Sequence, residues 1–267
     1  MSLSDEKLSF WDHVEIMRWM FIRCTIVVFG MSVLIFCFKN FIFDKIILSP
    51  CNVDFISYKW LYKMSVFFHT PSLYPEIHSI EMININLSTQ LMTHISISFY
   101  IAFIVSIPYI MFELWHFLSP ALYKYEIKPA IKSGFWFTLL FIIGILLAYF
   151  IIFPITLNFL GSYQVSESVK NQISLNSYIS TFLTLILMMG LVFEMPVVAY
   201  FLATLGVLSS NIFAKYRKVS FVFILTAAAF ITPSTDIFTM VLVACPLQLL
   251  YEFSRVIVKK VEKKHVA

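Results

Sequence analysis

The sequence predicts an all-α integral membrane protein that crosses the bilayer six times, with both ends in the cytoplasm. Of its 267 residues, 60% are hydrophobic and only 13% are charged, which is too few for the charged surface of a soluble domain. The apolar residues occur in long blocks rather than at amphipathic spacing, which is typical of segments that lie in lipid. The Lys and Arg residues are also distributed unevenly among the segments between these blocks.

Six apolar blocks define the expected spans, at residues 20–43, 91–114, 133–153, 178–205, 219–232 and 237–253. The hydrocarbon core requires about 20 helical residues, so helices 5 and 6 are expected to be short. Because only residues 233–236 separate them, they should form a tight hairpin that thins the bilayer or stops short of its far face. The longest loop, residues 44–90, is rich in proline and aromatic residues and is expected to form a folded outer cap.

The distribution of basic residues predicts the orientation. With the N-terminus inside, 14 of the 19 Lys and Arg residues lie in cytoplasmic segments, including the tail at residues 254–267, and five lie outside. This bias follows the positive-inside rule and predicts an N-in, C-in topology for a single membrane domain. Polar residues 1–12 precede the first block, and no small-residue cleavage site follows it, so we interpret that block as a retained span.

Several function classes are disfavoured by the absence of their motifs. The four cysteines are isolated and form no CxxC pattern, so we expect free thiols that behave as small hydrophobes rather than disulfides or metal ligands. The sequence contains no HExxH or GxSxG motif, and its six glycines form no phosphate-binding loop. We therefore expect no enzyme, no cofactor and no metal site, and the scattered basic residues do not indicate nucleic-acid binding.

Glu194 lies inside the fourth apolar block and is the strongest candidate functional residue. A carboxylate at the centre of a span costs about 2.5–3.5 kcal/mol on insertion scales, so a functional role is the default hypothesis. The alternative is a protonated Glu, or one satisfied by a neighbouring helix. Pro196 has no N–H, which leaves the carbonyl of Val192 free. The resulting polar spot must face a water-filled concavity or another helix.

Other polar residues have simpler interpretations on position alone. Glu126, in the loop between spans 2 and 3, is an ordinary solvated carboxylate by this reasoning. Asp236 is expected to cap the sixth helix. Glu15 and Arg18 lie three residues apart on an expected helix, where they could pair or act as an interfacial anchor. Glu113 ends the second span, and nothing in its position requires a function.

Six segments, in order along nearly the whole chain, resemble the TatC family of the twin-arginine protein translocase. The most specific is residues 117–126, which match the pattern F-x-x-P-A-L-Y-x-x-E of the first cytoplasmic loop. The other matching segments are Phe10–Val14 with Arg18, Gly144 with Ala148, Tyr149, Phe150, Phe153 and Pro154, Phe193–Pro196, Thr232–Pro233 with Asp236, and Pro50.

The resemblance implies a curved, cupped bundle that binds Arg-Arg signal peptides of folded proteins at the cytoplasmic face. It implies transport driven by the proton-motive force together with single-span TatA/TatB-type partners, in a homo-oligomeric complex of the cytoplasmic (inner) membrane or an organellar membrane. The signal-peptide site would comprise Glu126, Glu15, Arg18, Phe117, Pro120, Leu122 and Tyr123. The concave-face and structural residues would be Glu194, Pro196, Tyr149, Asp236, Thr232, Pro233 and Pro50, and Ala229 and Phe230 would contact a partner helix.

The chain departs from the family pattern near its N-terminus. The family's Glu stands two residues before the Arg, where this chain has Ile16, and Glu15 lies one residue earlier. One residue rotates a helical side chain by about 100°, so we expect Glu15 to matter less than Glu126. An alternative function is a proton-coupled secondary transporter of a small solute that uses Glu194. Transporters usually contain two similar halves, and no second copy of the Phe193–Pro196 segment is present.

Overall fold

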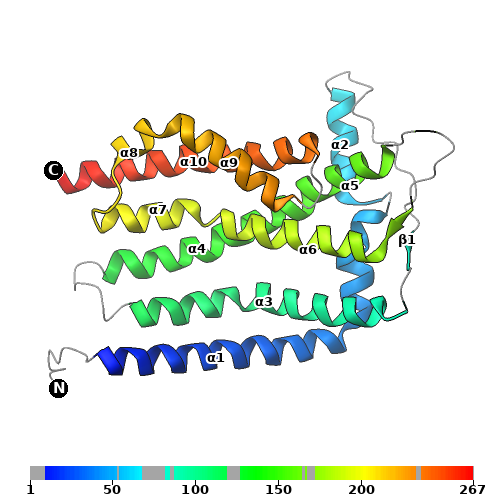
Figure 1. The fold of residues 1–267 in the computed structure, drawn as a ribbon, viewed down its shortest axis with the longest axis horizontal. Helices are drawn as coiled ribbons and strands as arrows, with labels where there is room; N and C mark the ends of the chain where they lie inside the picture. The colour runs from blue at the N-terminus through cyan, green and yellow to red at the C-terminus, as the bar shows by residue number, and fades with distance from the viewer. Residues whose placement is uncertain are drawn as a thin grey trace.

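The computed structural model describes residues 10–52, 54–67, 82–84, 87–118, 127–163, 166, 172–232 and 236–266. Long helices run side by side across the molecule (Figure 1). One end of the molecule, which we call the terminal end, holds the start of the first helix and the end of the last. The opposite end, which we call the cap end, holds the short elements of the loop after the first helix (Figure 1).

The first half of the chain contains two long helices separated by the cap. Its elements are α1 (Phe10–Cys37), the π-helical η1 (Phe41–Ile47), the 3-10 turn η2 (Ser49–Cys51), α2 (Ile56–Phe67), β1 (Met82–Ile83) and α3 (Thr89–Leu118). The cap predicted from the proline-rich loop therefore has a helix of its own, α2.

The described part of the second half consists mainly of helices, with one short strand, β2. Its elements are α4 (Ile127–Leu147), the π-helical η5 (Ala148–Ile152), α5 (Phe153–Ser162), β2 (Ile173–Ser174), α6 (Leu175–Val192), α7 (Met195–Thr204), α8 (Ser210–Lys215), α9 (Arg217–Ile231) and α10 (Ile237–Val266). Strands β1 and β2 pair in parallel at the cap end and tie the start of α3 to the start of α6.

Each predicted apolar block is largely helical. Five segments of the described chain are long and apolar enough to cross a membrane: Val14–Cys37, Thr89–Leu114, Gly134–Ser162, Leu175–Thr204 and Ile237–Lys263. The fifth predicted span, α9, has only 15 residues and is about 22 Å long, which is shorter than a hydrocarbon core of about 30 Å. The prediction of a short fifth helix is confirmed.

The prediction of a short sixth helix is wrong. Helix α10 continues for 30 residues and includes most of the tail at residues 254–267. Ser254 and Val258 are fully buried, and Val258 packs against Ala199 and Ala203 of α7. The tail carries its own apolar stripe beneath its lysines, so the helix gains packing contacts by continuing beyond the apolar block.

Two other boundaries differ from the sequence prediction. The fourth block forms two helices, because the chain turns at Phe193 and Glu194 between α6 and α7. The third block extends beyond residue 153 through η5 and α5 to Ser162. Pro154 does not stop it, because a proline at the second position of α5 removes an N–H that needs no helical partner there.

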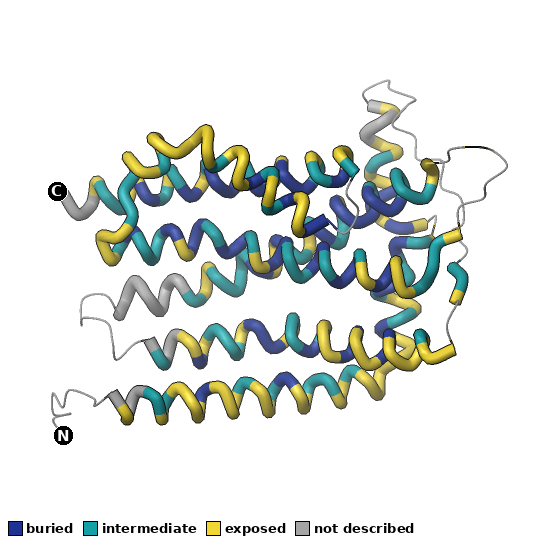
Figure 2. The backbone as a smooth tube through the Cα atoms, viewed as in Figure 1, coloured by how far each residue is buried: buried dark blue, intermediate teal, exposed yellow. Residues whose placement is uncertain are grey.

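The helices form an open row rather than a closed bundle. Helix α1 packs mainly on α3, which contacts α4 and α6, while α10 contacts α7 and α9 (Figure 1). Burial is concentrated in the middle of the row, and α1 is mostly exposed (Figure 2). Its exposed side chains, such as Ile26 and Phe29, are apolar, as expected for a surface that faces lipid.

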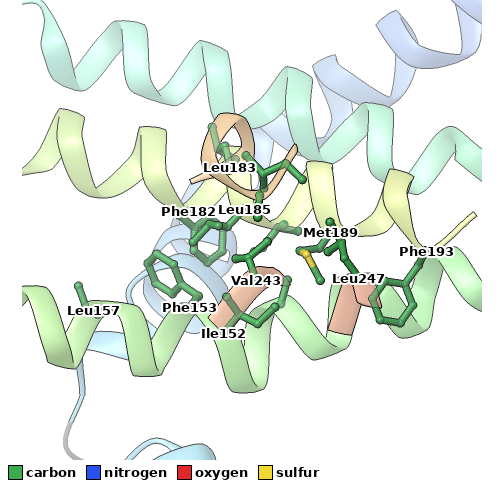
Figure 3. Packing of buried hydrophobic residues seen from close by; sticks show 14 of the residues in the cluster. Ile152, Phe153, Leu157, Phe182, Leu183, Leu185, Met189, Phe193, Val243 and Leu247 are labelled. Carbon is green, nitrogen blue, oxygen red and sulfur yellow. The ribbon is translucent and has the colours of Figure 1, made fainter. Parts of the chain in front are cut away.

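The main core lies where α6 meets η5, α5 and α10, and it is closely packed (Figure 3). The Phe153 ring meets Phe182 edge-on, with ring centroids 5.0 Å apart. A Cβ added at Gly144 of α4 would lie 2.8 Å from the Met189 carbonyl oxygen and from Phe193 Cβ. Glycine therefore lets the α4 and α6 backbones approach closely, which is the usual use of small residues between membrane helices.

Three tyrosine hydroxyls hold the segment at residues 46–50, at the cap end. Tyr58, Tyr149 and Tyr178 donate to the carbonyl oxygens of Pro50, Ile46 and Ile47, at 2.9, 2.8 and 2.5 Å. These tyrosines come from α2, η5 and α6, so one short segment is bonded to three elements. Burial raises the pKa of the Tyr58 hydroxyl, which keeps it protonated and able to donate.

Candidate functional site at the terminal end and the intramembrane carboxyl group

The terminal end brings together the segments predicted to bind a signal peptide. Helix α1 begins here, α3 ends here and α4 begins here (Figure 1). Glu15 and Arg18 form the predicted ion pair, with 3.7 Å between Glu15 Oε1 and an Arg18 Nη. Both side chains are about two-thirds exposed, so the pair is weak and its carboxylate remains open to other partners.

The other predicted signal-peptide residues lie at or beyond the edge of the described chain. Phe117 lies in the last turn of α3 and is partly buried. Pro120, Leu122, Tyr123 and Glu126 lie outside the described residues, as does Pro233 of the later turn. Their roles therefore remain predictions.

An ion pair between α1 and α3 was not predicted from the sequence. An Arg23 Nη lies 2.9 Å from Glu113 Oε2, and Tyr109 donates to Glu113 Oε1 at 2.8 Å. The Glu113 side chain is only 10% exposed. The available signal was an Arg within the first apolar segment, since a charged side chain at membrane depth requires a partner.

A second contact joins the same two helices nearer the cap end. The His94 ring stacks on Phe36 with centroids 4.0 Å apart, and its Nε2 lies 3.2 Å from the Phe36 carbonyl oxygen. This contact and the Arg23–Glu113 pair attach α1 to α3 at two positions along its length.

Glu194 lies at the break between α6 and α7 and is almost completely buried, with 3% of its surface exposed. Neither carboxyl oxygen has a hydrogen-bond partner of normal geometry among the described residues, although the backbone of Phe141 in α4 lies nearby. Of the two surroundings expected for this residue, the structure favours a neighbouring helix. Pro196 is the second residue of α7, where its missing N–H leaves no helical bond unmade.

An apolar groove of about 570 Å³ runs beside this break. Helices α4, α7 and α10 form its walls, with Trp136, Phe193, Pro196, Tyr200 and Phe253 among the lining residues. Buried Glu194 thus lies between two residues that line a groove suited to lipid chains or an apolar helix.

The remaining structural candidates lie in the cap and in the α9–α10 turn. Tyr149 and Pro50 both belong to the tyrosine–carbonyl cluster of the cap. Asp236 caps α10 as predicted, because its carboxylate accepts from the Thr239 N–H and hydroxyl, each at 2.7 Å. Thr232 is buried and donates its hydroxyl to the Ala228 carbonyl at 3.0 Å.

Ala229 and Phe230 lie on the outward face of α9. Phe230 is 85% exposed, whereas Ile224, Ala228 and Ile231 form the buried face of the same helix. The predicted partner-contact residues are therefore accessible from lipid.

These features define a class of protein: a multi-pass α-helical membrane protein with a buried carboxyl group in its fourth spanning segment. Within the described part of the chain, no three His, Cys, Asp or Glu side chains are grouped as metal ligands would be.

Comparison with known proteins identifies the family. A family model described as Sec-independent protein translocase protein (TatC) matches residues 12–246. TatC from Blattabacterium sp. subsp. Periplaneta americana is 35% identical over 99% of this chain and 100% of its own length. TatC from Aquifex aeolicus is 38% identical over 68% of this chain and 74% of its own length.

A solved structure agrees with these sequence matches. A crystal structure of the twin-arginine translocase receptor TatC superposes with a TM-score of 0.70 at 31% identity, covering 94% of this chain and 99% of that one. The chain belongs to the TatC family and is a component of a Sec-independent, Tat-type protein translocase. The relatives are named as translocase proteins rather than enzymes.

Proposed function

We propose that this chain is the receptor subunit of a twin-arginine translocase and binds Arg-Arg signal peptides at the cytoplasmic face. In this proposal it crosses the cytoplasmic membrane six times as a curved row of helices, with both ends inside. It acts with TatA/TatB-type single-span proteins and further copies of itself, and the proton-motive force drives transport. The small-solute transporter alternative relied on Glu194 alone, and the family match favours the receptor.

The position of Glu15 along the helix axes, relative to the end of α3, is the observation that carries this proposal. Arg23 pairs with Glu113, so these two positions are level in the row. Glu15 lies eight residues, or about 12 Å, before Arg23, whereas Leu118 lies five residues, or about 8 Å, beyond Glu113. The exposed Glu15 carboxylate thus lies about one turn past the end of α3, which is the height at which loop 119–126 begins.

The chemistry of an Arg-Arg ligand fits carboxylates at this height. A guanidinium group is always charged, and it can bond a carboxylate through two parallel N–H groups, which Lys cannot do. Glu126 is the only acidic residue of its loop, with lysines at positions 124, 128 and 132 around it. Those lysines repel cations in general. A ligand would therefore be selected by its ability to form two parallel hydrogen bonds with the Glu126 carboxylate.

The positions of the basic residues support the proposed orientation. Lys215, Arg217 and Lys218 lie in or beside α8 and at the start of α9, at the terminal end, where the lysine-rich end of α10 also lies (Figure 1). Lys39, Lys45 and Lys59 lie toward the cap end. Reporter fusions after Leu61 and after Tyr216 should report opposite compartments, and the same compartment for both would refute the topology.

Crosslinking tests the binding site directly. A twin-arginine precursor with a photocrosslinker beside its Arg pair should crosslink to loop 119–126 of the wild-type chain. Glu126→Ala and Glu126→Lys should abolish this crosslink while membrane insertion continues, and replacing Arg-Arg with Lys-Lys should be nearly as harmful. Asp54→Ala, which removes an exposed carboxylate at the cap end, is the matched control and should crosslink normally.

The outcome that contradicts the proposal is wild-type crosslinking and transport in Glu126→Lys. A larger defect in Glu15→Ala than in Glu126→Ala would instead show that the N-terminal helix holds the dominant carboxylate.

The exposed face of α9 is the proposed docking surface for a single-span partner. Its short length and its exposed apolar side chains favour contact with another helix over contact with a lipid layer of full thickness. Cysteine at Ala229 or Phe230 should form a disulfide with a cysteine-bearing partner helix. Phe29→Cys on the exposed face of α1 serves as the control, and traps found only there would refute this assignment.

A further inference from the structure

A second groove, with a polar lining, opens between α3 and α6 near the cap end. Its volume is about 890 Å³, and its lining comes from residues 87–100 and 176–184. Hydroxyl and amide side chains dominate this lining, including Thr93, Ser96, Asn176, Ser180 and Thr184. None of the described residues that line it is charged.

The polar lining extends deep into the part of the chain that spans the membrane. Tyr100 lies 11 residues, or about 17 Å, beyond the start of α3, and Thr184 lies nine residues, or about 14 Å, beyond the start of α6. Both belong to segments long and apolar enough to cross a membrane. The groove therefore reaches about halfway across a hydrocarbon core of about 30 Å.

Several hydroxyl groups outside the groove bond within their own helix. Thr25, Thr226 and Ser254, for example, donate to the carbonyl four residues earlier and so satisfy themselves within their own helix. Such bonding is the usual behaviour of Ser and Thr in membrane helices.

In the groove, Thr93, Ser96, Ser180 and Thr184 make no side-chain hydrogen bond to any described residue. An unsatisfied hydroxyl in an apolar medium costs roughly 1–3 kcal/mol, so these groups require water or a polar ligand.

We propose that this groove is a hydrated binding site for an uncharged, hydrogen-bonding stretch of polypeptide, namely the small-residue segment that follows the apolar stretch of a signal peptide. The inference rests on the proposed receptor function and adds a second subsite to it. An anionic lipid headgroup fits less well, because no Lys or Arg among the described lining residues could pair with a phosphate. The volume lies within the range of about 300–1,000 Å³ typical of ligand sites.

A signal peptide is long enough to connect the two subsites. From Leu118 at the end of α3 to Tyr100 in the groove is 18 residues, or about 27 Å. Signal peptides carry an apolar stretch of about 7–15 residues, followed by small residues; this stretch spans about 10–22 Å as a helix and about 25–50 Å when fully extended. A partly extended peptide whose charged end is held at loop 119–126 would therefore place its small-residue segment at this groove.

Thiol labelling tests whether the groove is hydrated. Ser96→Cys and Ser180→Cys are made in a transport-competent background that lacks the four native cysteines and are treated with a membrane-impermeant maleimide from the cap side. Ile95→Cys, one residue before Ser96 on an exposed part of α3 outside the groove lining, is the matched control. Labelling requires the thiolate, which water favours and lipid does not, so the groove positions should react at least about tenfold faster. Equal rates would overturn the proposal.

A bound precursor tests the ligand. Binding of a twin-arginine precursor should slow labelling of Ser180→Cys by about tenfold, the effect of a net occupancy free energy of about 1.4 kcal/mol. A cysteine in the small-residue segment of that precursor should form a disulfide with Ser180→Cys and not with Ile95→Cys.

Crosslinking at loop 119–126 in the same sample separates the two proposals. If the precursor crosslinks to the loop but neither protects nor traps the groove cysteine, the groove inference is overturned and the receptor function stands. If the precursor crosslinks at neither place, the receptor function itself fails.

Discussion

Removing one partner of the Arg23–Glu113 pair should destabilise the protein more than removing both. Glu113→Leu leaves a guanidinium group at membrane depth without the carboxylate that lies 2.9 Å from it. An unpaired Arg near the centre of a span costs about 2.5–3.5 kcal/mol on insertion scales. Arg23 is 47% exposed and can extend toward the interface, so we expect a loss of about 2–3 kcal/mol.

A double-mutant cycle measures this interaction. Thermal unfolding in detergent should show Arg23→Leu and Glu113→Leu to be harmful singly, while the double variant is close to wild type, because no charge is then left unpaired. The expected coupling energy is about 2 kcal/mol. Tyr109→Phe removes a single hydrogen bond to the same carboxylate and should cost about 1 kcal/mol.

The exposed Glu15–Arg18 pair provides the control. Its two side chains are about two-thirds exposed, so Glu15→Ala should cost no more than about 0.5 kcal/mol of stability. If the two single effects at Arg23 and Glu113 add to within about 0.5 kcal/mol, the charges do not stabilise each other, and the reasoning is refuted.

Three further predictions concern single positions. Glu194→Leu should raise the free energy of unfolding by about 1–3 kcal/mol, because it removes a buried carboxyl group without hydrogen-bond partners. The same variant should impair transport, which Glu194→Gln should largely retain. Full transport by the Leu variant would show that the carboxyl group is incidental. Gly144→Val should destabilise the protein by about 1–3 kcal/mol through overpacking against α6. In the same unfolding assay Gly30→Val should be neutral, because a Cβ at Gly30 meets nothing within 4 Å. Equal effects of the two substitutions would contradict the close approach of α4 and α6. Burial raises the pKa of the Cys51 thiol to about 11. The rate of its maleimide labelling should therefore be slow at pH 7 and rise about tenfold per pH unit up to pH 10. Rapid labelling at pH 7 would refute the burial.

The long apolar blocks were sufficient to predict the helices of the row, because the requirement to cross the bilayer dominates local sequence preferences. Asp236 was recognisable as a cap because an Asp just before an apolar helix has one usual role. The Glu194 break could be anticipated from Pro196, whose missing N–H weakens the helix at that point.

Contacts between distant residues could not be predicted in the same way. Glu113 has no feature of its own that indicates a partner, and its pairing with Arg23 depends on how α1 and α3 pack. The length of α10 was missed because the lysines of its end obscured a buried stripe that includes Val258. The polar groove was missed because Ser96 and Ser180 each look ordinary alone and become significant only when two helices face each other.

The tyrosine–carbonyl cluster of the cap also sets an order of events during biosynthesis. The carbonyls of Ile46 and Ile47 leave the ribosome 103 and 131 residues before the Tyr149 and Tyr178 hydroxyls that bond to them. At about 5–20 residues per second, this delay is about 5–25 s. In that interval, of the three tyrosines only Tyr58 can hold this segment, so a nascent chain stays loosely assembled until its fourth span arrives. A protease acting on the outer loop would therefore distinguish half-made from completed chains.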